Sequence, residues 1–256
     1  MNEERTLARL EMKLTTSENL SFKMSSLFHG ALMERLSEEY CEFLHTSKLH
    51  PFTQHLERKN DEWIWIVTTL DDQAKEEIIT KTLKNLYEFE LKRQNILVRI
   101  SDRSYTEISE RVLLTDFYNE QSSNYVNVHF ITPVSFKRKG KYLIYPDMFC
   151  IFQSLMNKYD NSSSAYEMVD PDTLEQIYNA SEIIRYNLKS TIFELEGVKI
   201  PSFTGWMTVR IAGNQNIKNF IHLLFKFGEY SGVGIKTALG MGAIEINRER
   251  SNTGDR

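Results

Sequence analysis

The order of the predicted strands and helices occurs twice along the chain, and this repetition constrains the fold more than any other feature. In the first half, residues with alternating or helical apolar spacing predict each element in turn. These elements are a strand at 7–14, a helix from about 25 to 45, strands at 52–56 and 63–69, a helix at 71–87 and a strand region at 89–108. The order strand, helix, strand, strand, helix, strand is that of a ferredoxin-like unit.

The second half repeats this order after a polar segment at 116–124, which is typical of a linker. Its predicted elements are strands at 125–136 and 142–145, helices at 148–159 and 171–180, strands at 183–195 and 203–211, a helix at 215–227 and a last strand at 243–246. We therefore predict an α+β protein with two tandem ferredoxin-like (RRM-like) βαββαβ domains and a C-terminal glycine-rich loop. The predicted boundaries are 1–118 for the N-terminal domain, 119–247 for the C-terminal domain and 248–256 for a polar tail.

The stretch between the last predicted helix and the last strand is rich in glycine. Five of the 11 glycines lie between Phe225 and Ile246. Glycine permits positive φ angles, and the amides of such a loop can cradle phosphate oxygens. Walker and dinucleotide loops are excluded, because both follow a strand and precede a helix. A tight connection is the alternative, but it needs only one or two glycines. The expected phosphate-binding residues are Gly232, Gly234, Lys236, Gly240 and Gly242.

Composition limits the classes of partner. The formal charge of -4 and a pI near 5.9 are not those of a basic nucleic-acid-binding domain, so positive charge for a polyanion must be local. One such cluster is a predicted basic turn made of Lys137, Arg138, Lys139 and Lys141. It is either a solvated hairpin tip or a grip on backbone phosphates.

Compartment and cofactor expectations follow from the same composition. Cys41 and Cys150 lie far apart and indicate buried thiols in a reducing compartment, and no metal-ligand spacing is present. The first residues lack the apolar core of a signal peptide, and no run of about 18 apolar residues predicts a membrane span. We expect a cytoplasmic protein without a membrane anchor, cofactor or metal.

Several blocks of sequence carry a resemblance to a known family. They are 27–32 (LFHGAL), 43–45 (FLH) with 51–53 (PFT), 131–137 (ITPVSFK), 145–147 (YPD), 200–205 (IPSFTG) and the glycine-rich loop ending at 239–242 (LGMG). Together they resemble the CRISPR-associated endoribonucleases of the repeat-associated mysterious protein superfamily, over nearly the whole chain. The resemblance implies two ferredoxin-like domains side by side and RNA held in their cleft. The implied partners are CRISPR repeat RNA and, beyond it, subunits of a CRISPR interference complex. The expected oligomeric state is a monomer or a homodimer.

The resemblance also implies a reaction without metal, in which the 2′-hydroxyl of the RNA attacks the adjacent phosphorus. This reaction needs a group that takes the hydroxyl proton, a group that gives a proton to the 5′-oxygen, and cations that hold the phosphate charge. Histidine suits proton transfer near neutral pH. Family members carry the catalytic histidine at positions matching either His45 or the region of His29, and both stay open here. His45 is slightly favoured, because the loop after it supplies Lys48, which resembles the phosphate-contacting lysine of the family.

Structural explanations compete with each of these roles. His29 lies on the apolar stripe of its helix, where a hydrogen-bonded core histidine is common, and His45 ends a helix, where it can interact with the helix dipole. His50 and His55 are interpreted as loop and strand surface. Two other functions remain open at this point: a non-catalytic subunit that only binds guide RNA, and a protein-interaction module with an acidic surface.

Overall fold

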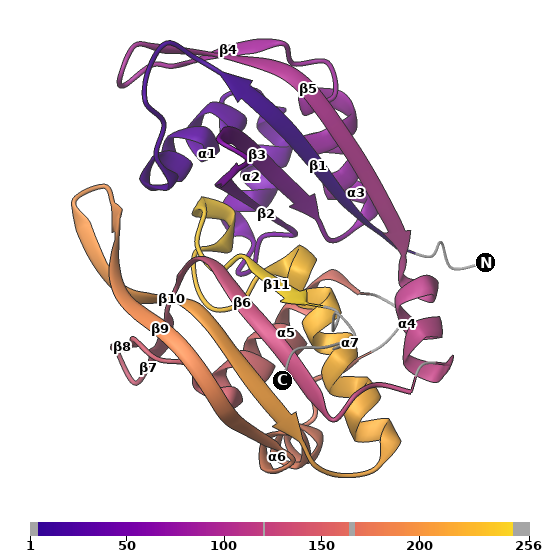
Figure 1. Cartoon of the computed structure of the whole chain (residues 1–256). Helices are drawn as coiled ribbons and strands as arrows, with labels where there is room; N and C mark the ends of the chain where they lie inside the picture. The colour runs from indigo at the N-terminus through magenta and orange to yellow at the C-terminus, as the bar shows by residue number, and fades with distance from the viewer. Residues whose placement is uncertain (1–4, 120, 164–166, 248–256) are drawn as a thin grey trace.

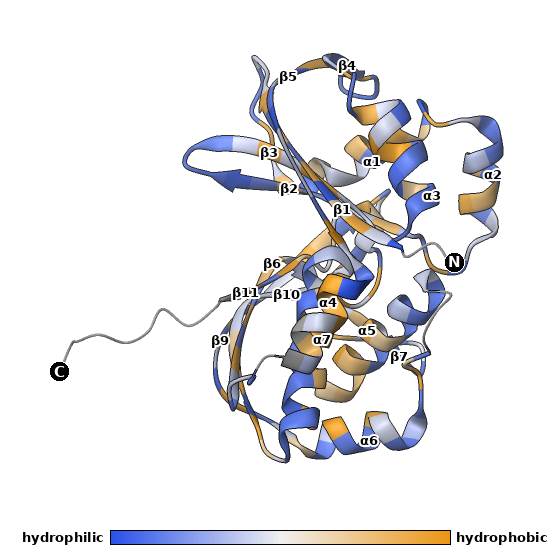
Figure 2. Cartoon of the chain, turned by 90° about the vertical axis from the view of Figure 1, so that its right-hand side faces the viewer, coloured by the Kyte–Doolittle hydropathy of each residue, from blue (hydrophilic) through white to orange (hydrophobic). Residues whose placement is uncertain are grey.

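Two large antiparallel sheets, each with helices on one side, and a small two-stranded sheet are present in the computed structural model, which describes residues 5–119, 121–163 and 167–247. The first sheet lies above the second in Figure 1, and the glycine-rich segment lies between them. Figure 2 shows that the helices of both domains lie on the same side of the two sheets. No described helix is long and apolar enough to cross a membrane.

The first domain has the sheet order β2-β3-β1-β5-β4. Its elements are β1 (Thr6–Thr15), α1 (Ser25–Met33), α2 (Glu38–Thr46), β2 (Phe52–Lys59), β3 (Glu62–Thr69), α3 (Asp72–Ala74) continued by the π-helical η2 (Lys75–Leu83), β4 (Glu88–Leu91) and β5 (Ile96–Ser109). A short 3-10 turn, η1 (Phe22–Met24), precedes α1. Strand β1 is the middle strand of this sheet, and its even-numbered residues from Ala8 to Leu14 are buried against the helices.

The expected helix from Ser25 to His45 is two helices, so that part of the prediction is wrong. Ser37 has an extended backbone, and its hydroxyl accepts a hydrogen bond from the Tyr40 amide. This is the geometry of a helix N-cap, so a new helix begins at Glu38. The break gives α1 and α2 different directions, and it separates His29 on α1 from His45 on α2.

The second domain has the sheet order β11-β6-β10-β9. Its elements are α4 (Glu110–Asn119), β6 (Tyr125–Val134), β7 (Phe136–Arg138), β8 (Lys141–Leu143), α5 (Met148–Ser162), α6 (Pro171–Asn179), β9 (Ser181–Leu195), β10 (Val198–Ile211), α7 (Gln215–Ser231), the 3-10 turn η3 (Thr237–Leu239) and β11 (Ile244–Asn247). In the first sheet β1 lies between β3 and β5, and in the second sheet β6 lies between β10 and β11. In a ferredoxin-like fold the first strand is likewise flanked by the third and the last.

Helix α4 occupies part of the expected linker and belongs by its contacts to the second domain. The Phe117 ring packs edge-on against Phe220 of α7 at 6.5 Å, and the Asn219 amide donates to the Phe117 carbonyl at 2.8 Å. The predicted polar tail at 248–256 lies outside the described residues.

A buried ionic network joins the start of β1 to the second domain. The Arg5 guanidinium lies 2.9 Å from the Glu110 carboxylate and 4.3 Å from the centre of the Tyr159 ring. The Tyr159 hydroxyl donates to the same carboxylate at 2.5 Å. Arg5 and Glu110 are both almost fully buried, so the pair couples the two domains.

Candidate active site

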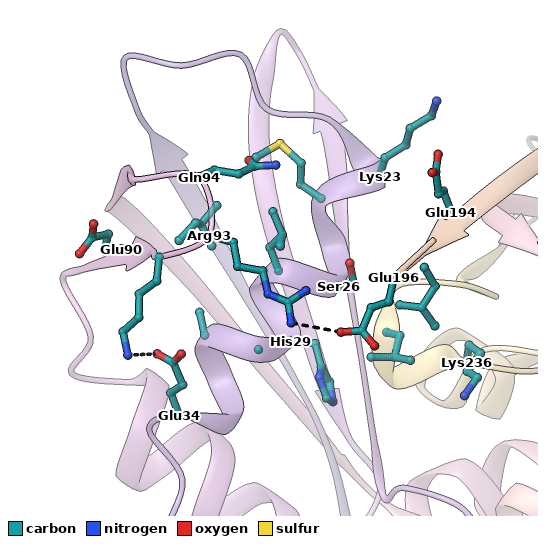
Figure 3. Close-up of a pocket in the computed structure, with 18 residues that line it drawn as sticks. Lys23, Ser26, His29, Glu34, Glu90, Arg93, Gln94, Glu194, Glu196 and Lys236 are labelled. Atoms are coloured by element: carbon teal, nitrogen blue, oxygen red, sulfur yellow. Dashed lines mark hydrogen bonds and ion pairs between the residues drawn. The ribbon is translucent and has the colours of Figure 1, made fainter. Parts of the chain in front are cut away.

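A pocket of about 640 Å³ lies where the two domains meet (Figure 3). Helix α1 contributes His29, the β4–β5 turn contributes Arg93, the β9–β10 hairpin contributes Glu196, and the glycine-rich loop contributes Lys236. An ion pair of 3.4 Å between Arg93 and Glu196 connects the two domains across this pocket. The pocket is therefore built from segments that lie far apart in the sequence.

Three aromatic rings, those of His29, His50 and Phe52, form a triangle at the edge of the pocket. The His29 ring stacks on Phe52 with centroids 6.1 Å apart, and the His50 ring stacks on the same phenylalanine at 5.7 Å. The two imidazoles are 6.5 Å from each other. Phe52 is fully buried in the first domain, so both imidazoles lie beside a ring that is anchored in the core.

Burial and mutual repulsion set the charge state of these imidazoles. Desolvation, followed by the nearby His50 and His45, lowers the pKa of His29 to about 4. Desolvation also lowers the pKa of His50, with further lowering from His45 and Lys236. Nε2 of His29 and Nδ1 of His50 are buried and have no hydrogen-bond partner among the described residues. At neutral pH His29 is uncharged, with one ring nitrogen unengaged by the protein.

His45 and Lys48 are more exposed than these two histidines. His45 lies in the last turn of α2, and Lys48 lies in the connection between α2 and β2. The structure brings His29, His45, His50 and Lys236 into one electrostatic group. Among the described residues, no ion pair or hydrogen bond joins Lys48 to these imidazoles.

The interpretation of His50 as loop surface was wrong, because its ring is half-buried against Phe52. A usable signal was present in the sequence. Proline at 51 restricts the residue before it to an extended backbone, and Phe52 begins a buried strand. A histidine in that place is held close to the domain core.

The glycine-rich loop turns its amides toward the protein, not toward the pocket. The expectation of outward-pointing glycine amides is therefore corrected. The donors and acceptors are Gly232 to the Gly228 carbonyl, Gly234 to the Ser154 hydroxyl, Gly240 to the Thr237 carbonyl and Gly242 to the Pro133 carbonyl. These four glycines shape the loop, and the exposed group that the loop presents to the pocket is Lys236.

Close packing explains the glycine at position 240. Its φ is +106°, and an added Cβ would lie 2.2 Å from the Cβ of Ser25, the first residue of α1. The loop thus docks directly on the helix that carries His29.

Gln54 reinforces this docking from the first domain. Its fully buried amide nitrogen donates to the Ser25 carbonyl at 2.9 Å and to the Ala238 carbonyl at 3.1 Å. Its oxygen accepts a hydrogen bond of 2.9 Å from the indole of Trp65. One side chain therefore fixes the start of α1 relative to the glycine-rich loop.

Comparison with known proteins identifies the family to which this chain belongs. The family model for the CRISPR-associated endoribonuclease Cas6 matches residues 128–244. A CRISPR-associated endoribonuclease Cas6 from Streptococcus thermophilus is 34% identical over 225 residues, which cover 87% of this chain and 91% of that protein. This chain belongs to the Cas6 family. A Cas6 from Mycobacterium tuberculosis is 30% identical over 220 residues, covering 85% of this chain and 70% of that protein.

Solved Cas6 structures have the same fold. A Cas6 solved in a product complex superposes with a TM-score of 0.76 at 18% identity, covering 94% of this chain and 99% of that chain. The architecture of two tandem ferredoxin-like domains is thereby confirmed. The predicted enzyme class, an endoribonuclease, is that of the Cas6 family.

The predicted basic turn lies on the β7–β8 hairpin of this Cas6 chain. Lys137, Arg138 and Lys139 are exposed, and none of them lines the pocket around His29 among its described residues. Arg138 lies 3.7 Å from Asp147 and 5.6 Å from the centre of the Phe149 ring. The structure does not bring this hairpin to the imidazoles.

Proposed function

We propose that this chain cuts CRISPR repeat RNA into individual guide RNAs in the pocket between its two domains. The observation that carries the proposal is that His29 from the first domain and Lys236 from the second line one pocket, with His45 and His50 close enough to lower the pKa of His29. The proposed reaction needs no metal. The 2′-oxygen bonds to phosphorus, the bond from phosphorus to the 5′-oxygen breaks, and the products carry a 2′,3′-cyclic phosphate and a 5′-hydroxyl.

In this proposal His29 takes the proton from the 2′-hydroxyl. Its lowered pKa leaves the ring neutral at pH 7, and among the described residues Nε2 has no partner that would compete for the proton. A bound phosphodiester adds negative charge beside the ring and raises the pKa again, because an opposite charge favours the protonated form. The same imidazole is thus a free base before RNA binds and a better proton acceptor afterwards.

His45 gives the proton to the departing 5′-oxygen. It is exposed in the last turn of α2, and the C-terminal end of a helix stabilises a cation. Exposure also lets the ring regain its proton from water after each cut.

Lys236 and Lys48 supply the positive charge. Lys236 lies at the pocket on the opposite side from α1, where it can stabilise the charge that develops on the phosphate. Lys48 and the basic residues Lys137, Arg138 and Lys139 are proposed to contact RNA phosphates outside the pocket. Gly232, Gly234, Gly240 and Gly242 contribute to RNA binding by fixing the path of the loop that carries Lys236.

Cleavage in EDTA tests the proposal. The purified protein is incubated with its repeat RNA in EDTA, and the ends of the products are analysed. A single cut that leaves a cyclic phosphate is expected. No cut in EDTA, followed by recovery in magnesium, contradicts the mechanism. Tight binding without cleavage in either buffer indicates the alternative, a non-catalytic RNA-binding subunit.

The proposed setting is the cytoplasm, with repeat RNA as the first partner. After cleavage the guide RNA passes to subunits of a CRISPR interference complex. The oligomeric state under this proposal is a monomer or a homodimer, which analytical ultracentrifugation of the free protein distinguishes.

A further inference from the structure

A lysine lies in the interior of the second domain, beneath the glycine-rich loop. Lys158 is on the inner face of α5, and burial lowers the pKa of its ammonium group to about 7. Its Nζ donates to the Ser231 and Gly232 carbonyls at 3.1 Å each and to the Thr237 hydroxyl at 3.3 Å. An ammonium group has three donors, so these three acceptors use all of them.

No described carboxylate forms an ion pair with Lys158. Its partners are instead the carbonyls at the C-terminal end of α7, where the helix dipole is negative. A buried charge without such partners is strongly unfavourable. The lysine is therefore matched to the end of α7 and to the loop that begins there.

The three acceptors flank Lys236. Ser231 and Gly232 precede it by a few residues, and Thr237 follows it directly. Lys236 has a left-handed backbone with φ of 59°, which is unfavourable for a residue with a side chain. Such a conformation persists only when its surroundings enforce it. The contacts of Lys158 on both sides of Lys236 are part of that enforcement.

We infer that Lys158 is a positioning residue for RNA cleavage, whose ammonium group fixes the segment from Ser231 to Thr237 so that Lys236 faces the imidazoles of the first domain. Lys158 does not touch the RNA. The inference rests on the proposed function for its effect on rate, but its effect on the loop is a property of the free protein.

The test uses Lys158→Met, which keeps an unbranched side chain, one atom shorter, and removes all three donors. The single-turnover cleavage rate at saturating protein is expected to fall about tenfold or more, because small misplacements of catalytic groups are costly. RNA affinity is expected to change by less than about threefold, since the basic surface is untouched. In the free protein, amide hydrogen exchange across 233–242 is expected to speed up by about tenfold.

Met156→Ala is the matched control. It removes a buried side chain two residues earlier in α5 that lines the pocket between α5 and α6. Both variants are compared at a temperature where circular dichroism shows them folded. Met156→Ala is expected to leave exchange in the loop and the rate at saturation unchanged.

Thr237→Val gives a second, milder variant that keeps the shape of the side chain and removes one acceptor of Lys158. A rate loss of roughly threefold is expected, because only one of the three hydrogen bonds of Lys158 is lost and the two carbonyl contacts remain. In a Lys158→Met background the same change is expected to have no further effect, because the two residues act through one contact.

Two results overturn the inference. The first is a Lys158→Met variant whose loop exchange and cleavage rate are those of the wild type. The second is a Met156→Ala variant that changes loop exchange and cleavage rate as much as Lys158→Met does. If Lys158→Met does not fold, a wild-type rate in Thr237→Val decides against the inference. If the wild-type protein does not cut RNA in EDTA, the proposed function fails separately, and the exchange measurement still tests Lys158.

Discussion

The two sides of the pocket differ in how they hold their functional groups. On the side of the first domain, His29 lies in the middle of a regular helix and stacks on the buried ring of Phe52. On the side of the second domain, Lys236 lies in an irregular loop and has a left-handed backbone. On the first side a regular helix holds His29, whereas the second side depends on hydrogen bonds from distant side chains such as Lys158. Proton-transfer groups and the charge that stabilises phosphate are thus supported by different kinds of structure.

The largest expected losses of cleavage rate come from removing the imidazoles of the first domain. His29→Ala should lower the single-turnover cleavage rate by about 10³-fold and His45→Ala by about 10²-fold, within the range for general acid–base catalysis. RNA affinity, measured by filter binding, should stay near the wild-type value in both. A His29→Ala variant that cuts at the wild-type rate would show that the regular side of the pocket does not carry the chemistry.

The second prediction tests how the two sides are joined. Gly240→Ala places a Cβ against Ser25 and forces a side chain at positive φ, so the free energy of unfolding should fall by roughly 2–4 kcal/mol. Gly140→Ala is the control, because Gly140 also has a positive φ of 78° but nothing lies within 4 Å of the added atom. It should lose only about 1 kcal/mol. Urea denaturation of both variants measures the difference, and equal losses would argue against close docking of the loop on α1.

The third prediction compares two kinds of positive charge. Lys236→Ala should lower the cleavage rate about tenfold at saturating protein, because the phosphate loses a stabilising cation at the pocket. Lys139→Ala, on the exposed hairpin, should weaken RNA binding without changing that rate. The slope of log binding constant against log salt concentration should become smaller by about one. Cleavage and binding titrations over a range of salt concentrations distinguish them. Identical behaviour of the two variants would show that Lys236 contributes to RNA binding and not to the cleavage step.

The smallest expected effect is a change in the free energy of unfolding at acidic pH. The pKa of His29 is about 4 in the folded protein and near its ordinary value of 6.5 in the unfolded chain. Between these values the unfolded chain binds more protons, so this histidine makes the folded state less stable as pH falls from 6.5 to 4. Since the ring is partly exposed, about 1 kcal/mol is expected. Urea denaturation at pH 7 and pH 4.5 should show a smaller acid loss for His29→Gln than for the wild type, and an equal loss would contradict it.

Much of the fold was predictable because it depends on local patterns. The alternation in 7–14 and the strongly strand-forming run at 63–67 fix β1 and β3, and the repeated element order fixes the domain type. The break at Ser37 was missed because a serine inside an apolar helical pattern is common, and only the contact of its hydroxyl shows the cap.

The site was less predictable because it depends on contacts between distant segments. Lys158 meets Ser231 across 73 positions, and Gln54 meets Ala238 across 184. No local pattern identifies such partners. The same limit explains the loop amides: glycine clusters predict an unusual backbone, but the direction of the N–H groups is decided by what the loop packs against.

The ionic network around Arg5 has a consequence for the order of events during synthesis. Arg5 and Glu110 find their shared aromatic neighbour only at Tyr159. While the protein is being translated, Arg5 and Glu110 both leave the ribosome before Tyr159, so their charges are still hydrated at that stage. The contact of Arg5 with Tyr159 therefore forms only after residue 159 has left the ribosome, so the joint between the two halves is completed late in synthesis.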